Sequence, residues 1–411
     1  MNRKVHMIRI EKALTQPVPS DLYMIGAPED VLFFDIETTG LSARSAGLYL
    51  IGVLAYTDKS WTLLQFFCED VADEPAVLQA FFELLHTKKI LVSYNGDGFD
   101  IPFLRHMLEQ YGLPYSFDAV ESFDLFKKFR PLKRLLGLPD LKLKSCERFL
   151  GIDREDRFTG GELIEVYFEW QKTKTPALLD TLLLHNAEDI ANLPNLLPLL
   201  RYRSLPHSDF QLRAHERLQD GGTPLVHLSF TLLSPMSPSA HAPAENATRE
   251  ATDERRQHHP GAVGNSPREE TDDRRQHWPA LTLPKPMDLR GDFWALHAEG
   301  SAVELYVQLF EGERKLFFAD FEHYYYLPAE DQVIHQSLAE FVDRSARKKA
   351  CARNCYQRVT GCFLPEWNEL YTPALQAEYR DKLRYAQYSD TLFDDEVKAV
   401  TYLKSFLEAA L

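Results

Sequence analysis

The sequence predicts an α/β protein in which helices flank a mixed β-sheet, followed by a disordered linker and a small α+β C-terminal domain. Three observations support this fold class. Short apolar runs alternate with helical spacing between residues 31 and 111, an order typical of α/β folds. Helical stripes occupy residues 141–201. Large aliphatic residues become rare after Ser234 and return near residue 286, so the segment between cannot form a core.

The first part of the chain is expected to begin with three strands. They are the aliphatic and aromatic runs Val31–Asp35, Leu48–Tyr56 and Trp61–Phe67, the last two joined as a hairpin by turn residues. A helix, a strand and a second helix should follow at residues 75–86, 90–94 and 101–111. This order is the opening of an RNase H-like fold, although other α/β folds share parts of it.

We expect three regions along the chain: an RNase H-like domain at 28–202, a linker at 234–282 and a C-terminal domain at 286–411. The linker contains an imperfect duplication, TDERRQHHP at 252–260 and TDDRRQHWP at 271–279. In the last region, residues 302–310 and 315–321 should pair as strands. Helices are expected there at 334–346, 375–386 and 394–410.

Composition argues against two classes of protein. No apolar run is long enough to span a bilayer, and Met1–Ile10 lacks the apolar stretch of a secretory signal. Five cysteines scattered over 411 residues do not form a disulfide framework. A reducing, cytoplasmic location is therefore the simpler expectation.

The first candidate functional residues are Asp35 and Glu37, in the run DIETTGL that follows an apolar strand. Side chains alternate along a strand, so both carboxylates point to the same face. They lie at the end of the strand, where a buried core opens toward a site. Such a pair alone is common on surface strands. The full run after an all-apolar strand is a far more specific sign of a functional site.

A second candidate acid, Asp100, follows the apolar strand ending at Tyr94 and a glycine-rich turn, at the start of a helix with Pro102 in its first turn. Asp100 can serve a site, cap its helix, or do both. Asn95, at the end of the strand, can bind the substrate backbone or hold the turn, and the sequence does not separate these roles.

The third candidate pair is His185 and Asp189, in the run HNAED. Residues four apart lie on one face of a helix, so the two side chains project together. A lone pair of this kind is usually solvated. This helix also carries Leu182, Leu183, Leu184 and Ile190, which indicates close packing and places the pair at the edge of a cleft.

Several carboxylates converging on one point suit phosphodiester hydrolysis. Hard Mg²⁺ or Mn²⁺ ions prefer oxygen ligands. In two-metal sites the ions sit ~4 Å apart, one activating water and the other stabilising the leaving oxygen.

The three segments resemble the exonuclease motifs of the DEDD (DnaQ-like) 3′–5′ exonuclease superfamily, and more closely the YprB-type RNase H-like family. The run LKLKSCERFL at Leu141–Leu150, the turn Gly160-Gly161-Glu162 and HNAED carry the closer resemblance, which covers residues 28–202. It implies a hydrolase that cuts single-stranded DNA or RNA with two Mg²⁺ or Mn²⁺ ions. It further implies four metal-binding carboxylates, Asp35, Glu37, Asp100 and Asp189, and a His185 that positions or deprotonates the attacking water.

Two departures from that superfamily concern the site. His185 stands four residues before Asp189, the spacing of tyrosine-type members, whereas the histidine-type members have five. The role of His185 is therefore less well supported than those of the acids. Asp97-Gly98 stands where related sequences more often have a basic or small polar pair, and an extra acid there would alter metal affinity or weaken strand binding.

Substrate contacts are expected from the side chains of Thr38, Asn95, Lys127, Lys128 and Arg130. The lysines and Arg130 open the densest basic run of a chain whose net charge is −15, so they form either a phosphate track or a solvated helical face. Asp124 is either a further acid near the site or a capping residue. Phe123, Phe126 and Phe129 can stack on bases, but core packing explains them more simply.

Two other classes of function remain open: a non-catalytic nucleic-acid-binding or scaffolding protein that keeps the fold, and a structure-specific endonuclease. Protein partners are not indicated by the sequence. In the C-terminal region, the spacing of Cys351, Cys355 and Cys362 fits no familiar zinc pattern. A basic cluster spans Arg344 to Arg358, and Tyr324-Tyr325-Tyr326 can stack bases or alternate in burial along a strand.

Overall fold

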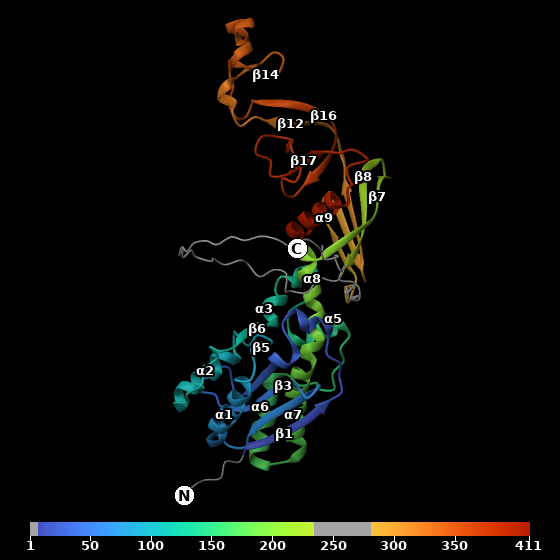
Figure 1. Ribbon diagram of the computed structural model, residues 1–411. Coiled ribbons are helices and arrows are strands. Elements are labelled where there is room, and N and C mark those ends of the chain that lie inside the picture. The colour runs from blue at the N-terminus through green and yellow to red at the C-terminus, as the bar shows by residue number, and fades with distance from the viewer. Residues whose placement is uncertain (1–6, 234–280) are drawn as a thin grey trace, which may run out of the picture.

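The computed structural model describes residues 7–233 and 281–411 (Figure 1). The predicted linker and its duplication lie almost entirely outside these residues. The first part of the chain is built on a six-stranded mixed sheet of order β1-β4-β3-β2-β5-β6. Its strands are β1 (Met7–Leu14), β2 (Val31–Thr38), β3 (Leu48–Thr57), β4 (Ser60–Cys68), β5 (Ile90–Ser93) and β6 (Glu121–Asp124).

The strands predicted between residues 31 and 94 are confirmed, as is the hairpin, which closes at Thr57 opposite Ser60. Strand β2 lies inside the sheet, antiparallel to β3 and parallel to β5. Its residues Val31–Phe34 are fully buried, which explains why the sequence there is apolar without alternation. Because β2 and β5 are parallel, their carboxyl ends open at the same edge of the sheet.

Helices cover both faces of this sheet. On one face, α1 (Glu74–Leu85) and α2 (Asp100–Tyr111) share a buried core with the sheet. On the other, α6 (Gly160–Thr173) and α7 (Pro176–Leu196) enclose a second cluster around Tyr49 and Trp170. Short helices α3 (Leu125–Phe129), α4 (Leu132–Leu135) and α5 (Leu143–Leu150) complete this part. The predicted RNase H-like mixed sheet flanked by helices is confirmed.

Helix α7 approaches the sheet unusually closely at Gly52, the residue of β3 that pairs with Asp35. A Cβ atom on Gly52 would collide with Asn186 Oδ1 and Ile190 Cδ1 of α7. Only a residue without a side chain leaves room there. This contact sets the distance between α7 and the sheet. It therefore sets the position of the side chains that α7 directs toward Asp35.

A second sheet begins soon after α7. The chain continues through α8 (Leu200–Ser204) into β7 (Asp209–Asp220) and β8 (Thr223–Leu233), which join β9 (Met287–Arg290), β10 (Trp294–Glu299) and β11 (Ala302–Gln308) in the order β7-β8-β11-β10-β9. One continuous buried cluster extends from Phe33 of the first sheet to Phe230 of the second and Tyr402 of α9 (Glu396–Ala410). Figure 1 shows the first sheet at one end of the molecule and the C-terminal strands at the other.

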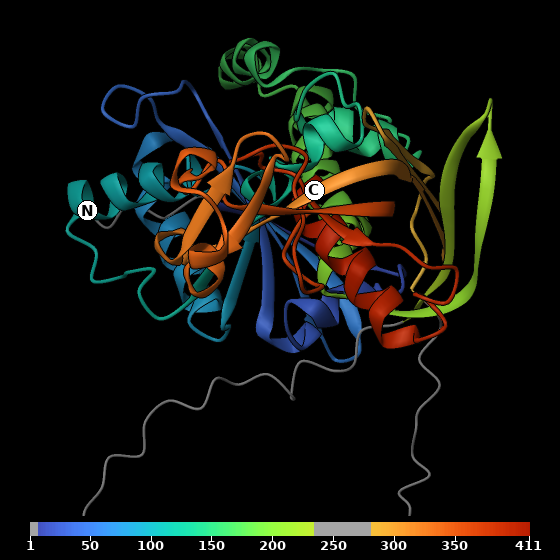
Figure 2. The ribbon, with the colours of Figure 1, turned by 90° about the horizontal axis from the view of Figure 1, so that it is seen from above.

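The C-terminal region is richer in strands than the sequence predicted. Its remaining strands are β12 (Phe310–Phe317), β13 (Tyr324–Leu327), β14 (Gln332–His335), β15 (Lys348–Lys349), β16 (Tyr356–Glu366) and β17 (Arg384–Gln387), in two three-stranded sheets of order β12-β16-β17 and β14-β13-β15. Figure 2 views the same elements from above. The terminal helix predicted at 394–410 is confirmed as α9.

Three predictions for this region are wrong. The expected strand pair does not form, because β11 pairs with β8 and β10 while β12 pairs with β16. The helix expected at 334–346 is the end of β14 followed by short 3₁₀ turns. The helix expected at 375–386 is extended chain, with Leu375 bridged to Tyr385. The apolar spacing of both expected helices fits helical turns, but in the second the bridges of Leu375 to Tyr385 and of Gln376 to Lys315 override this local pattern.

Among the described residues no helix is both long and apolar enough to cross a membrane. All five cysteines are free thiols, and two of them, Cys68 and Cys146, are buried. The prediction that the cysteines form no disulfide framework is therefore confirmed.

Candidate metal centre

The four predicted acids come together where β2 and β5 end. Asp35 and Glu37 lie at the end of β2, and Asp100 is the first residue of α2, which follows β5. Asp189 projects from α7 toward them. Asp100 does not cap its helix: its Oδ1 accepts a hydrogen bond of 3.2 Å from the backbone N–H of Ile36, between the two acids of β2.

Burial, together with mutual repulsion, governs the electrostatics of these acids. Burial and the charges of Asp100, Glu37 and Asp189 raise the pKa of Asp35 well above its usual range. Burial and Asp189 do the same to the pKa of Glu37, although a hydrogen bond from Tyr49 opposes the shift. Burial raises the pKa of Asp100 to about 7. The polypeptide alone therefore leaves a desolvated cluster of negative charge without enough positive charge beside it.

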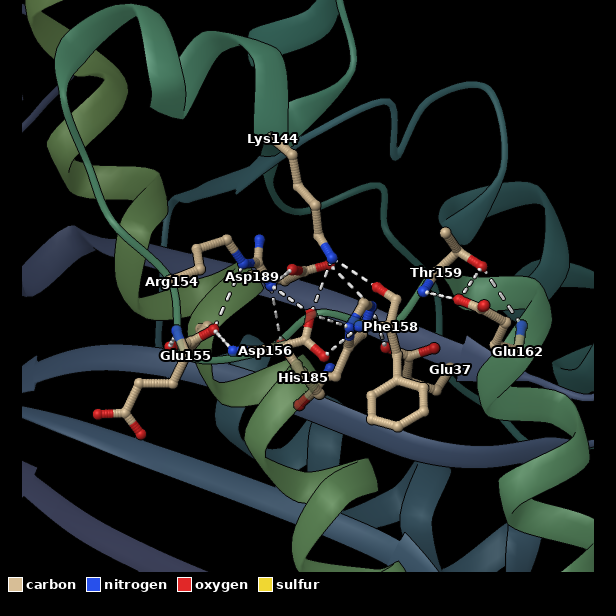
Figure 3. Close-up of polar contacts among 12 residues, drawn as sticks. Glu37, Lys144, Arg154, Glu155, Asp156, Phe158, Thr159, Glu162, His185 and Asp189 are labelled. Carbon is tan, nitrogen blue, oxygen red and sulfur yellow. Dashed lines mark hydrogen bonds and ion pairs between the residues drawn. The ribbon is translucent and has the colours of Figure 1, made fainter.

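His185 directs one ring nitrogen into this cluster. Its Nε2 lies 3.7 Å from Glu37 Oε1 and 3.5 Å from Asp189 Oδ2, and the three residues form a group that can hold a metal ion. The predicted helical face is thus confirmed, because His185 and Asp189 do project together from α7. Figure 3 shows Glu37, His185 and Asp189 pointing toward one another.

The other ring nitrogen of His185 is held by Asp156. His185 Nδ1 lies 2.8 Å from Asp156 Oδ2, and Lys144 Nζ lies 2.8 Å from the same oxygen. Burial opposes the ionisation of Asp156, but hydrogen bonds from Lys144, the Phe158 N–H and His185 hold the pKa of Asp156 below its usual value. An ionised Asp156 accepts a hydrogen bond from the Nδ1–H of His185, which leaves the lone pair of Nε2 facing the acids in the neutral ring.

Arg154 is the cation closest to the acids. Its guanidinium donates to Glu147 and Asp189 and lies 3.5 Å from Asp156 and 3.4 Å from Glu188 (Figure 3). The side chain is 7% exposed, so these charges interact in a weakly screened environment. Burial alone lowers the pKa of Arg154, but Asp189 and Glu147 outweigh it and raise the value above normal.

Asn186 connects α7 to the strand that carries Asp35. Its Nδ2 donates to Asp35 Oδ2 over 3.2 Å, and its Oδ1 accepts from Gln65 Nε2 over 3.0 Å. Gln65 Nε2 also donates to the backbone carbonyl of Leu183. Asn186 is fully buried, so these bonds fix its orientation and hold one oxygen of Asp35.

Sequence reasoning missed the residues that support the predicted acids. Arg154 and Asp156 come from the loop between α5 and α6, and Asn186 lies inside the HNAED run that was examined only for its His and Asp. The loop IDREDR does carry a signal, since it alternates charge directly after the apolar stripe of α5. For Gly52, the sequence shows only a glycine within a strand and does not reveal the close approach of α7.

The residues predicted to contact the substrate have varied surroundings. Asn95 has a φ of 68° and its backbone N–H donates to Asp124 Oδ1, so its backbone holds the turn, while the residue itself is exposed. Asp124 also accepts from the N–H of Asp97 and caps α3, which gives it the capping role. Lys127 is paired with Asp97 at 2.7 Å.

The three remaining candidates lie at or near the surface. Lys128 Nζ lies 4.7 Å from the centre of the Phe123 ring, Arg130 is exposed, and Thr38 Oγ1 donates to the Gly40 carbonyl. Phe129 is buried in the core, whereas Phe126 is half-buried. None of these contacts tests substrate binding, so the expected roles of Thr38, Asn95, Lys127, Lys128 and Arg130 stay predictions.

The donor set fits divalent cations. Four carboxylates supply the hard oxygen ligands that Mg²⁺ and Mn²⁺ prefer. Burial raises the pKa of Asp35, Glu37 and Asp100, and a bound cation would favour their ionised forms. The imidazole nitrogen of His185 adds a donor that Mn²⁺ accepts more readily than Mg²⁺. Asp35, Glu37, Asp100 and Asp189 would hold such ions, while His185 and Arg154 border them.

Comparison with known proteins agrees with this fold. Residues 32–201 match the family model described as RNase_H superfamily, which spans the central strands of the first sheet and all four acids. A comparison with curated proteins gives no match.

Solved structures that match part of this chain include the family B DNA polymerase from the hyperthermophilic archaeon Pyrobaculum calidifontis. It is 19% identical with a TM-score of 0.34, over 44% of this chain and 25% of the polymerase. A nuclease solved in its apo form is 16% identical with a TM-score of 0.29, over 46% of this chain and 79% of that chain. An E. coli ExoI–ssDNA complex is 15% identical with a TM-score of 0.26, over 49% of this chain and 54% of ExoI.

Replacing Arg154 by alanine tests whether this arginine stabilises the buried acids around the site. The substitution leaves the carboxylate of Glu147, which is 1% exposed, without its cation, and we expect a loss of about 3–5 kcal/mol in the free energy of unfolding. Thermal and urea unfolding would measure the loss. Arg157→Ala, an exposed arginine of the same loop, is the matched control and should change the free energy by less than about 0.5 kcal/mol. Equal effects of the two substitutions would contradict the assignment.

Proposed function

We propose that the protein is a divalent-metal-dependent nuclease, a hydrolase of phosphodiester bonds that removes nucleotides from the 3′ ends of single-stranded DNA or RNA. The observation that carries the proposal is the convergence of four carboxylates, three of which have pKa values raised by burial, with the Nε2 atom of His185. Membership of the YprB-type family, suggested by the LKLKSCERFL and HNAED runs, is part of the same proposal.

The proposed reaction is the attack of water on a phosphodiester phosphorus. The bond from phosphorus to the 3′ oxygen of the preceding nucleotide breaks, which releases a nucleoside 5′-monophosphate and a shortened strand whose 3′ oxygen takes a proton from solvent. Bound Mg²⁺ or Mn²⁺ ions, two in the proposed site, would supply an acidified water and neutralise charge on the phosphate oxygens. Asp35, Glu37, Asp100 and Asp189 hold these ions. Asn186 fixes one oxygen of Asp35, and the N–H of Ile36 fixes one oxygen of Asp100, so two of the ligands are already oriented.

His185 is the proposed acceptor of the water proton. Its Nε2 faces the gap bordered by Glu37 and Asp189, and Asp156 stabilises the imidazolium that forms when the proton arrives. Lys144 and Arg154 share the charge of Asp156 and keep that carboxylate in place. Thr38, Asn95, Lys128 and Arg130 are proposed to contact the strand, with Lys127 joining them only if it leaves Asp97.

A cytoplasmic location is part of the proposal, since unpaired thiols such as those of Cys68 and Cys146 persist in reducing compartments. Nucleic acid is the partner that the site implies. Protein partners are not proposed.

The test compares purified wild type with Asp189→Asn on three labelled substrates: a linear single strand, a circular single strand and a duplex. With Mg²⁺ or Mn²⁺ we expect stepwise shortening of the 5′-labelled linear strand by wild type, no cutting of the circle, and no reaction in EDTA. Asp189→Asn should be inactive because it loses one carboxylate charge from the metal centre.

Other outcomes assign other functions. Cutting of the circle favours an endonuclease. Binding of oligonucleotides without cleavage under either metal favours the non-catalytic reading, which the Arg154–Asp189 ion pair also suits because it occupies one of the four acids.

A further inference from the structure

The small sheet β14-β13-β15 is the least buried part of the described chain. Ala339 is the single buried residue between Phe321 and Ala350. In Figure 1 this sheet, labelled at β14, lies at the end of the molecule farthest from the first sheet. A segment with so small a core gains little from its own packing, and its exposed side chains are available to a partner.

Alternation along β13 gives this sheet two different faces. Tyr324 and Tyr326 point toward the rest of the C-terminal region: the Tyr324 ring stacks on Phe318 at 5.1 Å, and Tyr326 donates to Asp331, which Tyr356 also contacts. Tyr325 therefore points to the opposite face. Its neighbours across the sheet on that face are Ile334 and Lys349. The predicted strand is present, but Tyr324, Tyr325 and Tyr326 are all half-buried, so the predicted alternation in burial is not observed.

The Tyr325 face holds two cations above the tyrosine ring. The guanidinium carbon of Arg347 lies 4.9 Å from the ring centre and Lys349 Nζ lies 4.6 Å from it. Both contacts are cation–π interactions, which restrict the motion of the two long side chains. The charges are therefore held in place on the face before any ligand arrives, which lowers the entropic cost of binding.

These two residues belong to a strongly basic segment of an acidic protein. From Arg344 to Arg358 the chain has six lysines and arginines and no aspartate or glutamate, although its net charge is −15. Arg358 pairs with Asp331 and Glu313. The other five, Arg344, Arg347, Lys348, Lys349 and Arg353, form no ion pair with any acid in the part of the chain that the structure describes.

An exposed aromatic ring lies in the turn next to this sheet. Phe341, in the 3₁₀ turn Gln336–Phe341 that packs against β13 and β14, is 78% exposed, and Leu338 of the same turn is 54% exposed. The ring offers a surface that a flat apolar group can cover. Unpaired nucleobases are such groups, and they are attached to the phosphates that the cations would bind.

We propose that Arg347, Lys349 and Phe341 form a second binding site for single-stranded nucleic acid, separate from the metal centre. The cations neutralise backbone phosphates and Phe341 stacks on a base. Charge complementarity selects a polyanion, and the exposed ring selects unpaired bases over a duplex. An acidic peptide would satisfy the charges but leave Phe341 uncovered. The inference does not require that the protein cleaves nucleic acid.

The test measures binding of a labelled oligonucleotide of about 20 nucleotides to the full chain by fluorescence anisotropy. EDTA in the buffer removes metal-dependent binding at the first site, so failure of the proposed nuclease activity does not affect the result. Phe341→Ala should weaken binding about tenfold, and Phe341→Tyr should keep it within about twofold of wild type, because both aromatic rings stack. Lys349→Gln should weaken binding about fivefold and lower the salt dependence of log K by about 1.

Matched control variants distinguish loss of this binding site from general effects of removing a charge or an exposed apolar side chain. Lys382→Gln removes an exposed lysine elsewhere in the C-terminal region, and Val397→Ala removes an apolar side chain that is 73% exposed on α9. Both should bind like wild type. The proposal is overturned if the controls weaken binding as much as the test variants, if Phe341→Ala has no effect, or if duplex binds more tightly than single strand. A change in oligomeric state with unchanged binding would assign the surface to self-association instead.

Discussion

Replacing Asp35 by asparagine is expected to abolish cleavage and, at the same time, to stabilise the metal-free protein. Activity should fall by roughly three orders of magnitude or more, because one ligand charge is lost from the centre. Stability should rise because the ionised Asp35 is disfavoured by burial and by Asp100, Glu37 and Asp189. A gain of about 0.5–2 kcal/mol, or about 2–6 °C in Tm, is typical when a strained functional group is removed.

The pH dependence of this gain follows from the sign of the pKa shift. A raised pKa means that wild type becomes less stable, relative to the variant, as the pH rises through the range where Asp35 ionises. The Tm difference between Asp35→Asn and wild type in EDTA should therefore be larger at pH 8 than at pH 5. Added Mn²⁺ should raise the Tm of wild type more than that of the variant.

Asp180→Asn, an exposed aspartate on α7, is the matched control and should change neither activity nor Tm appreciably. A lower Tm for Asp35→Asn in EDTA would show that Asp35 is stabilised by the fold rather than opposed by it. That result would contradict the reading of these acids as a metal centre.

Replacing Gly52 by alanine should lower both stability and activity without changing any charged residue. The new methyl group would collide with Asn186 Oδ1 and Ile190 Cδ1, so α7 must move away from β3. We expect a loss of about 1–3 kcal/mol in the free energy of unfolding, as for other overpacked cores. Activity should fall by about 100-fold or more, since a displacement of ~1 Å at the reacting groups costs that much.

Gly160→Ala is the matched control, because a Cβ atom there meets nothing within 4 Å. Thermal unfolding and single-turnover cleavage would measure both variants. Metal binding followed by calorimetry adds a separate readout, since a shifted Asp189 should weaken it. If Gly52→Ala retains normal cleavage, the spacing between α7 and β3 does not set the geometry of the site.

Much of the first sheet could be predicted because its strands and helices carry local patterns. Val31–Phe34 is apolar throughout, and α7 has its acid and histidine four residues apart, so both signals lie within a few residues. The supporting side chains could not be found in this way. Arg154 and Asp156 reach the site from a loop, and their function depends on which acids the fold places beside them.

The C-terminal region shows the opposite case. Residues 334–346 and 375–386 have apolar spacing that fits helical turns, yet both are mainly turns and extended chain. In the second segment a partner far away in sequence helps to decide the conformation, since Gln376 is bridged to Lys315. Strands β7 and β8 were not predicted at all. Strand β8 pairs with both β7 and β11, and the residues that the structure does not describe lie between β8 and β11 in the sequence.

The continuous buried cluster between the two sheets has a consequence for how the protein is dissected. Leu199, Leu200 and Tyr202 at the end of the helical segment belong to the same cluster as Phe210, Phe230 and Tyr402. A fragment that stops near residue 202 would keep every acid of the metal centre but expose the side chains that anchor the end of α7. The first sheet and the C-terminal strands should therefore unfold in one cooperative transition. The packing of the C-terminal strands thus also supports α7, the helix that carries Asp189.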